Sequence, residues 1–285
     1  MLDMFTQDFI FSALKVSIIM GLLLSYLGVH VVGRGIVFVD LALGQISMLG
    51  VAFANYLEKD PTIISIVFTM VGAFILSFVN VKDKRLKQEA IIGIVYAVTS
   101  AATVLLISKA PHGESDISEV LFGSLFTVTT TQIMIMASVF GLIGLGHIIF
   151  RRKFFDLTEK FENHQVEHIG VFNLWNFLFY LSIGLAIVLA VRAGGVIPVF
   201  SYIVVPPVSA ILLSRKKSSL VLIALLVSIA GSFFGIYFST HFDFPAGSSV
   251  VAILGVIFLV AAGVRLVRRR TAGEETREGT EGHQV

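Results

Sequence analysis

The sequence contains no cysteine, a single tryptophan and few charged residues. Only 14% of its 285 residues are charged, and 56% are hydrophobic. The absence of cysteine excludes disulfide bonds, thiolate metal ligands and a cysteine nucleophile. The hydrophobic share of 56% argues against a soluble domain, in which apolar residues normally make up about 45–50%. A net charge of +2 is too small to indicate nucleic-acid binding. Lipid is therefore the expected solvent for most of this chain.

The apolar residues fall into nine runs, each long enough for one membrane-spanning helix of about 20 residues. The first run follows two aspartates instead of a basic segment and lacks a clear cleavage site, so it is interpreted as a retained helix and not as a signal peptide. The predicted fold is an all-α, polytopic transmembrane bundle of eight or nine spans. The nine runs are Phe9–Val32, Ile36–Leu57, Ile63–Val81, Ala90–Ile107, Ile133–Phe150, Phe172–Val191, Val196–Leu213, Leu220–Thr240 and Ser249–Val267.

The basic residues predict the orientation of the bundle. If the Arg-rich segment 268–270 lies in the cytoplasm, nine spans place the basic clusters at 215–217, 151–153 and 82–87 on the same side. Cytoplasmic loops carry an excess of Lys and Arg, so this asymmetry supports a cytoplasmic C-terminus in a plasma membrane. Residues 1–270 form the predicted membrane domain. Residues 271–285, rich in Glu, Gly and Thr, are expected to be a disordered cytoplasmic tail.

Two segments have irregular patterns. Pro206 and Pro207 remove two backbone donors in the middle of the seventh run, which a membrane tolerates where neighbouring protein or a water-filled cavity satisfies the freed carbonyls. We therefore expect an irregular segment that lines a pathway around Pro206. The other segment, residues 121–131, joins a short apolar piece to a threonine-rich stretch, and is expected to dip into the outer leaflet.

The sequence lacks the common catalytic motifs. It has no G-x-x-x-x-G-K-[ST] loop to bind nucleotide phosphates, no H-E-x-x-H zinc motif and no paired intramembrane aspartates. His164 and His168 share i, i+4 spacing, but they lie in a polar loop and are interpreted as a solvated helix face. We therefore expect neither an enzyme nor a bound cofactor.

Asp40 is the clearest candidate for a functional residue within the spans, because ionisable groups in lipid are costly. One interpretation is that it pairs with Arg34 or Arg192 at the membrane interface. The other is that it lines a translocation pathway with Gln45 and further polar or helix-breaking residues. The candidate pathway residues are Asp40, Gln45, Ser47, Tyr96 and Pro206.

Residues 154–170 form the longest polar stretch between spans. Leu157 and Phe161 fall on one helical stripe with charged residues around it, and Gly170 is a stop signal. The pattern predicts a short amphipathic helix that either lies on lipid headgroups or binds a soluble partner. Its roughly neutral charge favours the partner.

The blocks in the sequence resemble the membrane permease of ABC-type importers for zinc, manganese and iron, from about Gly33 to about Val260. No one block is specific, but their order and spacing match the family. The blocks are Gly33–Phe38 with Leu43 and Gly50–Ala52, Lys82–Ser108, Leu121–Leu125, Phe155–Gly170, Gly195–Ala210 and Phe244–Gly247.

The resemblance implies a permease that forms a homodimer around a central pathway. Separate cytoplasmic ATPase subunits would bind the coupling helix at residues 154–170, through Phe155, Asp156, Phe161 and Gly170. A solute-binding protein on the opposite side would deliver the substrate. Members of this family often carry Asp and His, four residues apart, at the positions that are Leu41 and Gln45 here. Neither residue supplies a carboxylate or imidazole ligand, so the metal ligands are not identified from the sequence.

Three alternatives remain beside a divalent-metal importer. The same architecture would also suit a metal chelate or another small solute. A self-sufficient secondary transporter would need its own coupling site, for which Asp40 and the Pro206–Pro207 segment are the nearest candidates. An intramembrane enzyme would need a paired acid, base or nucleophile in the spans, and the sequence offers none.

Overall fold

The fold is that of a helical bundle, as the apolar runs predict. The computed structural model describes residues 7–79, 86–108, 125–163, 173–214 and 216–281, with side chains up to residue 268, and these residues contain no β-strand. Each of the nine predicted spans lies on a helix. The α-helices are α1 (Asp8–Arg34), α2 (Val39–Tyr56), α3 (Pro61–Ser77), α4 (Gln88–Ile107), α6 (Thr130–Ile149), α7 (Arg151–Glu162), α8 (Leu174–Gly194), α9 (Val196–Leu213), α10 (Lys217–Phe242) and α11 (Ala246–Glu281).

Seven of these helices are long and apolar enough to cross a membrane: α1, α4, α6, α8, α9, α10 and α11. Helix α3 is equally apolar but has only 17 residues. Helix α2 has 18 residues and includes Asp40, Gln45 and Asn55, which lower its hydropathy. The all-helical, multi-span architecture is confirmed, and these two helices account for the difference between seven and nine spans.

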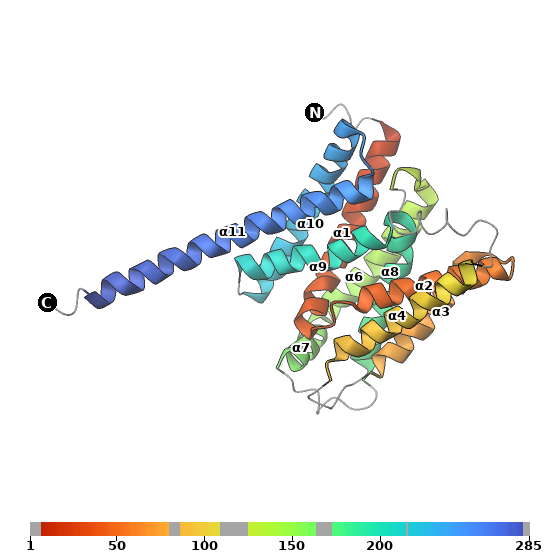
Figure 1. Ribbon diagram of the computed structural model, residues 1–285, viewed down its shortest axis with the longest axis horizontal. Coiled ribbons are helices and arrows are strands. Elements are labelled where there is room, and N and C mark those ends of the chain that lie inside the picture. Colours follow the sequence, from red (N-terminus) through yellow and green to blue (C-terminus); the bar gives the residue numbers. More distant parts are fainter. Residues whose placement is uncertain (1–6, 80–85, 109–124, 164–172, 215, 282–285) are drawn as a thin grey trace.

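The helices form two packed groups joined by α1 and α8 (Figure 1). In one group α2 packs against α3 and α4, and α3 packs against α8. In the other group α1 packs against α9 and α10, and α11 covers both of them. The main core therefore lies along α1, α8 and α9, where Leu24, Ile187 and Tyr202 are fully buried.

A left-handed glycine turn joins α1 to α2. Gly35 ends α1 with φ of +67°, and the amides of Gly35 and Ile36 bond to the carbonyls of Val32 and Val31. Glycine is favoured at this position because it has no Cβ to clash in the left-handed region. The short turn brings Asp40 into the first turn of α2, near the end of α1 that carries Arg34.

The expected interruption at Pro206 and Pro207 is not observed, because α9 continues through both prolines. The prolines remove the helical bonds to the carbonyls of Tyr202 and Ile203. Helix α1 packs directly on this part of α9: a Cβ on Gly28 would lie 2.0 Å from the carbonyl oxygen of Ile203. Close packing of a neighbouring helix, and not a break, thus accommodates the double proline.

Two other segments differ from their expected bounds. A 3₁₀ turn, η2 (Leu125–Thr127), precedes α6, and Leu125 is buried in the main core; residues 121–124 lie outside the described part of the chain. Helix α11 continues beyond the predicted span Ser249–Val267, to Glu281, and projects beyond the bundle (Figure 1). Once a long apolar helix has formed, adding Glu and Arg residues to its end requires no new nucleation.

Candidate coupling site and translocation pathway

Helix α7 is the predicted amphipathic helix, and it lies at one end of the bundle (Figure 1). It begins at Arg151 and ends at Glu162, so it starts earlier than the predicted 154–170 segment. Residues 164–170, including Gly170 and the histidine pair, lie outside the described residues. Its buried side chains occupy one face with i, i+3, i+4, i+7 spacing, and they are Phe154, Leu157, Thr158 and Phe161. This apolar face packs on α1 and α8.

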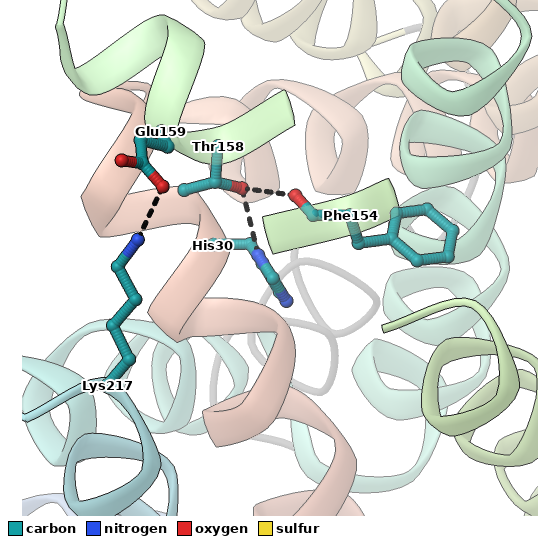
Figure 2. Close-up of polar contacts among 5 residues, drawn as sticks. All are labelled: His30, Phe154, Thr158, Glu159 and Lys217. Carbon is teal, nitrogen blue, oxygen red and sulfur yellow. Dashed lines mark hydrogen bonds and ion pairs between the residues drawn. The ribbon is translucent and has the colours of Figure 1, made fainter. Parts of the chain in front are cut away.

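Thr158 connects α7 to α1 through a buried hydrogen-bond network. Its hydroxyl oxygen lies 2.9 Å from His30 Nδ1 and 3.1 Å from Arg34 Nε, and it donates to the carbonyl of Phe154 at 3.0 Å. Figure 2 shows the bonds to His30 and Phe154. A hydroxyl has one proton to donate and two lone pairs to accept. Because the proton goes to Phe154, the His30 ring donates from Nδ1.

The rest of the network follows from that assignment. His30 Nε2 is then an acceptor, and it receives the hydroxyl proton of Tyr26 at 3.3 Å. Arg34 also donates from Nη1 to Asn176 on α8 at 3.2 Å, and its guanidinium lies 3.6 Å from the centre of the Phe179 ring. The network and this cation–π contact stabilise a guanidinium that is only 6% exposed.

Aromatic contacts also hold α7 against the bundle. The ring of Phe154 stacks on His147 of α6, with centroids 3.9 Å apart and planes inclined by 8°. Trp175 at the start of α8 lies edge-on to Phe154 at 5.7 Å and packs beside Leu157 and Phe161. Three spans, α1, α6 and α8, therefore hold one face of α7.

The opposite edge of α7 contacts α10. Glu159 Oε2 and Lys217 Nζ form an ion pair at 2.7 Å, with both side chains about half exposed (Figure 2). Such an exposed pair contributes at most about 1 kcal/mol. Both residues of this ion pair line a cavity of about 640 Å³. Gly33, Phe155 and Arg265 line the same cavity. The last turn of α1, the start of α10 and the part of α11 around Arg265 thus line one cavity beside α7.

The four predicted coupling residues have different positions. Phe161 is buried and lies 5.4 Å below the Arg34 guanidinium, and Phe155 is half-buried with its ring 4.6 Å from that of His30. Asp156 is exposed on the outer face of α7. Phe155 and Phe161 therefore attach α7 to the bundle, while Asp156 remains accessible to a partner.

Sequence reasoning did not identify His30, Arg34 and Thr158 as a unit. His30 and Arg34 do have i, i+4 spacing on α1, which places both on one face of a helix. Thr158 follows in the chain by 128 and 124 residues. The spacing alone was a signal for a shared polar face on α1, but only the fold shows that α7 supplies its partner.

The candidate pathway residues on α2 lie on two faces. Asp40 and Ser47 are both 3% exposed, and between them Gly44 lies next to α8, where a Cβ would meet Ile187 at 4.0 Å. Leu41 and Gln45 are only partly buried. One residue corresponds to about 100° of helix rotation, so Asp40 does not replace a ligand at position 41.

Asp40 has an unusual environment. Neither of its carboxylate oxygens has a hydrogen-bond partner within the described part of the chain. The interpretation that it pairs with a nearby arginine is not supported there, because Arg34 donates to Thr158 and Asn176, and Arg192 donates to Thr62. The N-terminal end of α2 offers partial compensation, because the helix dipole favours an anion in the first turn.

The remaining pathway candidates are not joined to Asp40 by any side-chain hydrogen bond among the described residues. Tyr96 lies on α4 and is 37% exposed, and Pro206 is buried in α9. The described residues also contain no group of three or more His, Cys, Asp or Glu side chains that would hold a metal ion. A preformed metal site is therefore absent from this part of the single chain.

Taken together, the bundle of spans, the helix seated at its end and the buried carboxylate define a polytopic membrane permease. The model of the ABC 3 transport family matches residues 6–265, and the chain belongs to this family. Its fold resembles a solved chain of PsaBC from Streptococcus pneumoniae in complex with Fab. That likeness has a TM-score of 0.76 and 24% identity, and covers 91% of this chain and 93% of the other.

Curated relatives cover nearly the same length. The manganese transport system membrane protein MntC of Listeria monocytogenes is 27% identical over 89% of this chain and 90% of its own. The high-affinity zinc uptake system membrane protein ZnuB of Haemophilus influenzae is 25% identical over 89% of this chain and 97% of its own. The resemblance inferred from the sequence blocks is therefore confirmed at the level of the family.

Proposed function

We propose that this chain is the permease subunit of an importer for a divalent metal ion, and that separate cytoplasmic ATPase subunits drive it by binding α7. The observation that carries this proposal is the position of α7. It is a polar helix of 12 residues at the end of the bundle, with its apolar face held by three spans and Asp156 exposed on the other. A helix with this arrangement is suited to transmit movement from a soluble partner.

Two connections would transmit that movement. Displacement of α7 reaches α1 through the buried bonds of Thr158 to His30 and Arg34. It reaches α10 through the weaker ion pair between Glu159 and Lys217. Because α1 and α10 pack against each other and against α9, a shift of α7 would be passed to three spans, which is what alternating access requires.

The proposed substrate class follows from the relatives, which are named for manganese and zinc transport. Within this chain, Asp40 is the residue best suited to a passing cation, because its buried carboxylate lacks a partner in the described residues. Carboxylate oxygens are good ligands for Mn²⁺ and acceptable ones for Zn²⁺. A metal chelate is the second candidate, favoured by the lack of a cluster of ligands in the described residues.

A second copy of the chain would supply the other wall of the pathway. Gln45 lies partly exposed on α2, and an amide left unsatisfied in hydrocarbon is costly. Contact with a partner helix removes that cost.

The proposed orientation places the α7 end and the C-terminus in the cytoplasm, because the basic residues gather there. A solute-binding protein would then act at the opposite end.

The test is reconstitution of the permease with its ATPase subunits in liposomes. We expect ATP-dependent uptake and ATPase stimulation by at least one of Mn²⁺, Zn²⁺ and Fe²⁺ supplied with the binding protein. Asp156→Ala should abolish coupling without reducing membrane insertion, whereas Asp8→Ala, an exposed aspartate at the other end of α1, should be neutral. Uptake by the purified chain alone, driven by an ion gradient, would overturn the ABC mechanism. Stimulation by a chelate but by none of the three ions would favour the second substrate.

The role of Asp40 has a separate test in the same liposomes. Asp40→Ala should reduce uptake more than Gln45→Ala, because only Asp40 offers a negative charge to the cation. ATPase binding should be unchanged in both variants. Equal and negligible effects of the two substitutions would show that Asp40 has no part in the pathway.

A further inference from the structure

A second cavity lies between spans of the bundle, and Tyr26 is the one lining residue discussed above. It has a volume of about 490 Å³ and lies between α1, α6 and α10. Helix α1 packs against both other helices and contributes Leu22 and Tyr26, while α6 and α10 supply the walls. The lining side chains are apolar apart from the Tyr26 hydroxyl, which is bonded to His30.

Two glycines give the cavity its width. Gly141 and Gly144 of α6 both line it, and a Cβ added at either position would meet nothing within 4 Å. In a membrane an open apolar cavity on the bundle is filled by lipid chains, since water finds no hydrogen-bond partners there.

The length of the cavity matches one leaflet of the bilayer. Its lining on α6 runs from Ala137 to Ile148, which corresponds to about 16 Å along the helix at 1.5 Å per residue. One leaflet contributes about half of a hydrocarbon core of roughly 30 Å. A single acyl chain would therefore fill the cavity from the midplane to the headgroup region.

Positive charge gathers at one end of the cavity. Ile148, the last lining residue of α6, is followed by the exposed side chains of Arg151 and Arg152. On the other wall, Val221 is preceded by the exposed Lys216 and by Lys217, which pairs with Glu159. Basic residues beside an apolar groove attract anionic headgroups, and arginine binds phosphate with two parallel bonds.

We propose that the groove between α1, α6 and α10 is a binding site for an anionic phospholipid. One acyl chain lies along Gly141 and Gly144, and the headgroup phosphate lies against Arg151 and Arg152. The lipid then contacts α6 and the start of α7 together, so it supports the connection between the spans and α7.

The test is native mass spectrometry of the purified full-length chain in detergent, with added phosphatidylglycerol or phosphatidylcholine. We expect phosphatidylglycerol to remain bound in preference to phosphatidylcholine. Gly144→Leu fills the groove and should abolish this binding. Gly255→Leu is the matched control, because a Cβ added to Gly255 of α11 would also meet nothing within 4 Å.

A second pair of variants tests the headgroup contact without changing the groove. Arg151→Gln combined with Arg152→Gln should weaken phosphatidylglycerol binding about tenfold or more, as expected for the loss of two charges near an anionic lipid. Lys59→Gln, at the opposite end of the bundle, should leave it unchanged. Equal retention of both lipids, or equal behaviour of the Gly144 and Gly255 variants, would overturn the proposal. Unchanged binding in the double arginine variant would also overturn it.

Discussion

The attachment of α7 to the bundle depends most strongly on one hydroxyl group, that of Thr158. The substitution Thr158→Val keeps the shape of the side chain and its methyl contact with Gly33, whose added Cβ would lie 2.9 Å from Thr158 Cγ2. It removes the acceptor for His30 Nδ1 and Arg34 Nε. The carbonyl of Phe154 is less affected, because it retains its backbone helix bond.

The magnitude follows from the two buried donors that lose their partner. Each unsatisfied group costs about 1–3 kcal/mol, and more where it is charged, so the loss of two partners should destabilise the fold by roughly 2–6 kcal/mol. For a large domain each kcal/mol lowers the unfolding midpoint by about 2–4 °C. We therefore expect a decrease of roughly 4–24 °C in detergent.

Thr158→Ser is the matched control. It keeps the hydroxyl and removes only the methyl group beside Gly33, which costs about 1 kcal/mol. The valine variant should also be cleaved by trypsin within α7 at lower protease concentrations than the serine variant, because α7 separates from α1 more often. Equal midpoints and equal cleavage for the two variants would refute the assignment of Thr158 as the central acceptor.

Two further predictions concern helix packing and helix capping. Gly28→Ala should destabilise the bundle by about 1–3 kcal/mol in the same unfolding assay, because its Cβ would overlap the carbonyl of Ile203, whereas Gly255→Ala should be nearly neutral. Asp60→Ala removes the side chain that caps α3, where hydrogen bonds from Thr62 and then the charge of Arg192 lower the pKa of Asp60 from 3.8. The charged cap stabilises the fold above pH 3.8, and this stabilisation is lost as the pH falls through the lower folded-state pKa of Asp60. The difference in stability between wild type and Asp60→Ala should therefore vanish in acid. A stability difference that persists in acid would contradict the charged cap.

The apolar runs predicted the helices well, because a span needs about 20 consecutive apolar residues and few charges interrupt them. The amphipathic pattern also located α7, since Leu157 and Phe161 are indeed buried on one face. Its start was misplaced because Arg151–Lys153 were interpreted as a loop, although they are compatible with the first turn of a helix whose other residues pack on the bundle.

The buried network was not predictable from local patterns. His30 and Arg34 meet Thr158 only because α7 folds back onto α1, and no local periodicity encodes that contact. The same reason explains α9: the sequence shows two prolines, but the continuity of the helix depends on the close packing of Gly28, a residue on another helix.

The two faces of α2 bear on how the proposed permease would select its cargo. Asp40 is buried on the face with Gly44 and Ser47, while Leu41 and Gln45 occupy a more exposed face about 100° away. A cation that contacts Asp40 therefore does not contact both family ligand positions of the same chain. Since Leu41 also supplies no donor atom, a cation bound at Asp40 under the proposed function would take additional ligands from water, from the carrier of the metal or from a second copy. Under the proposed function, selectivity between metals would depend on how the cation is delivered, and on Asp40, more than on a preformed set of side chains in one subunit.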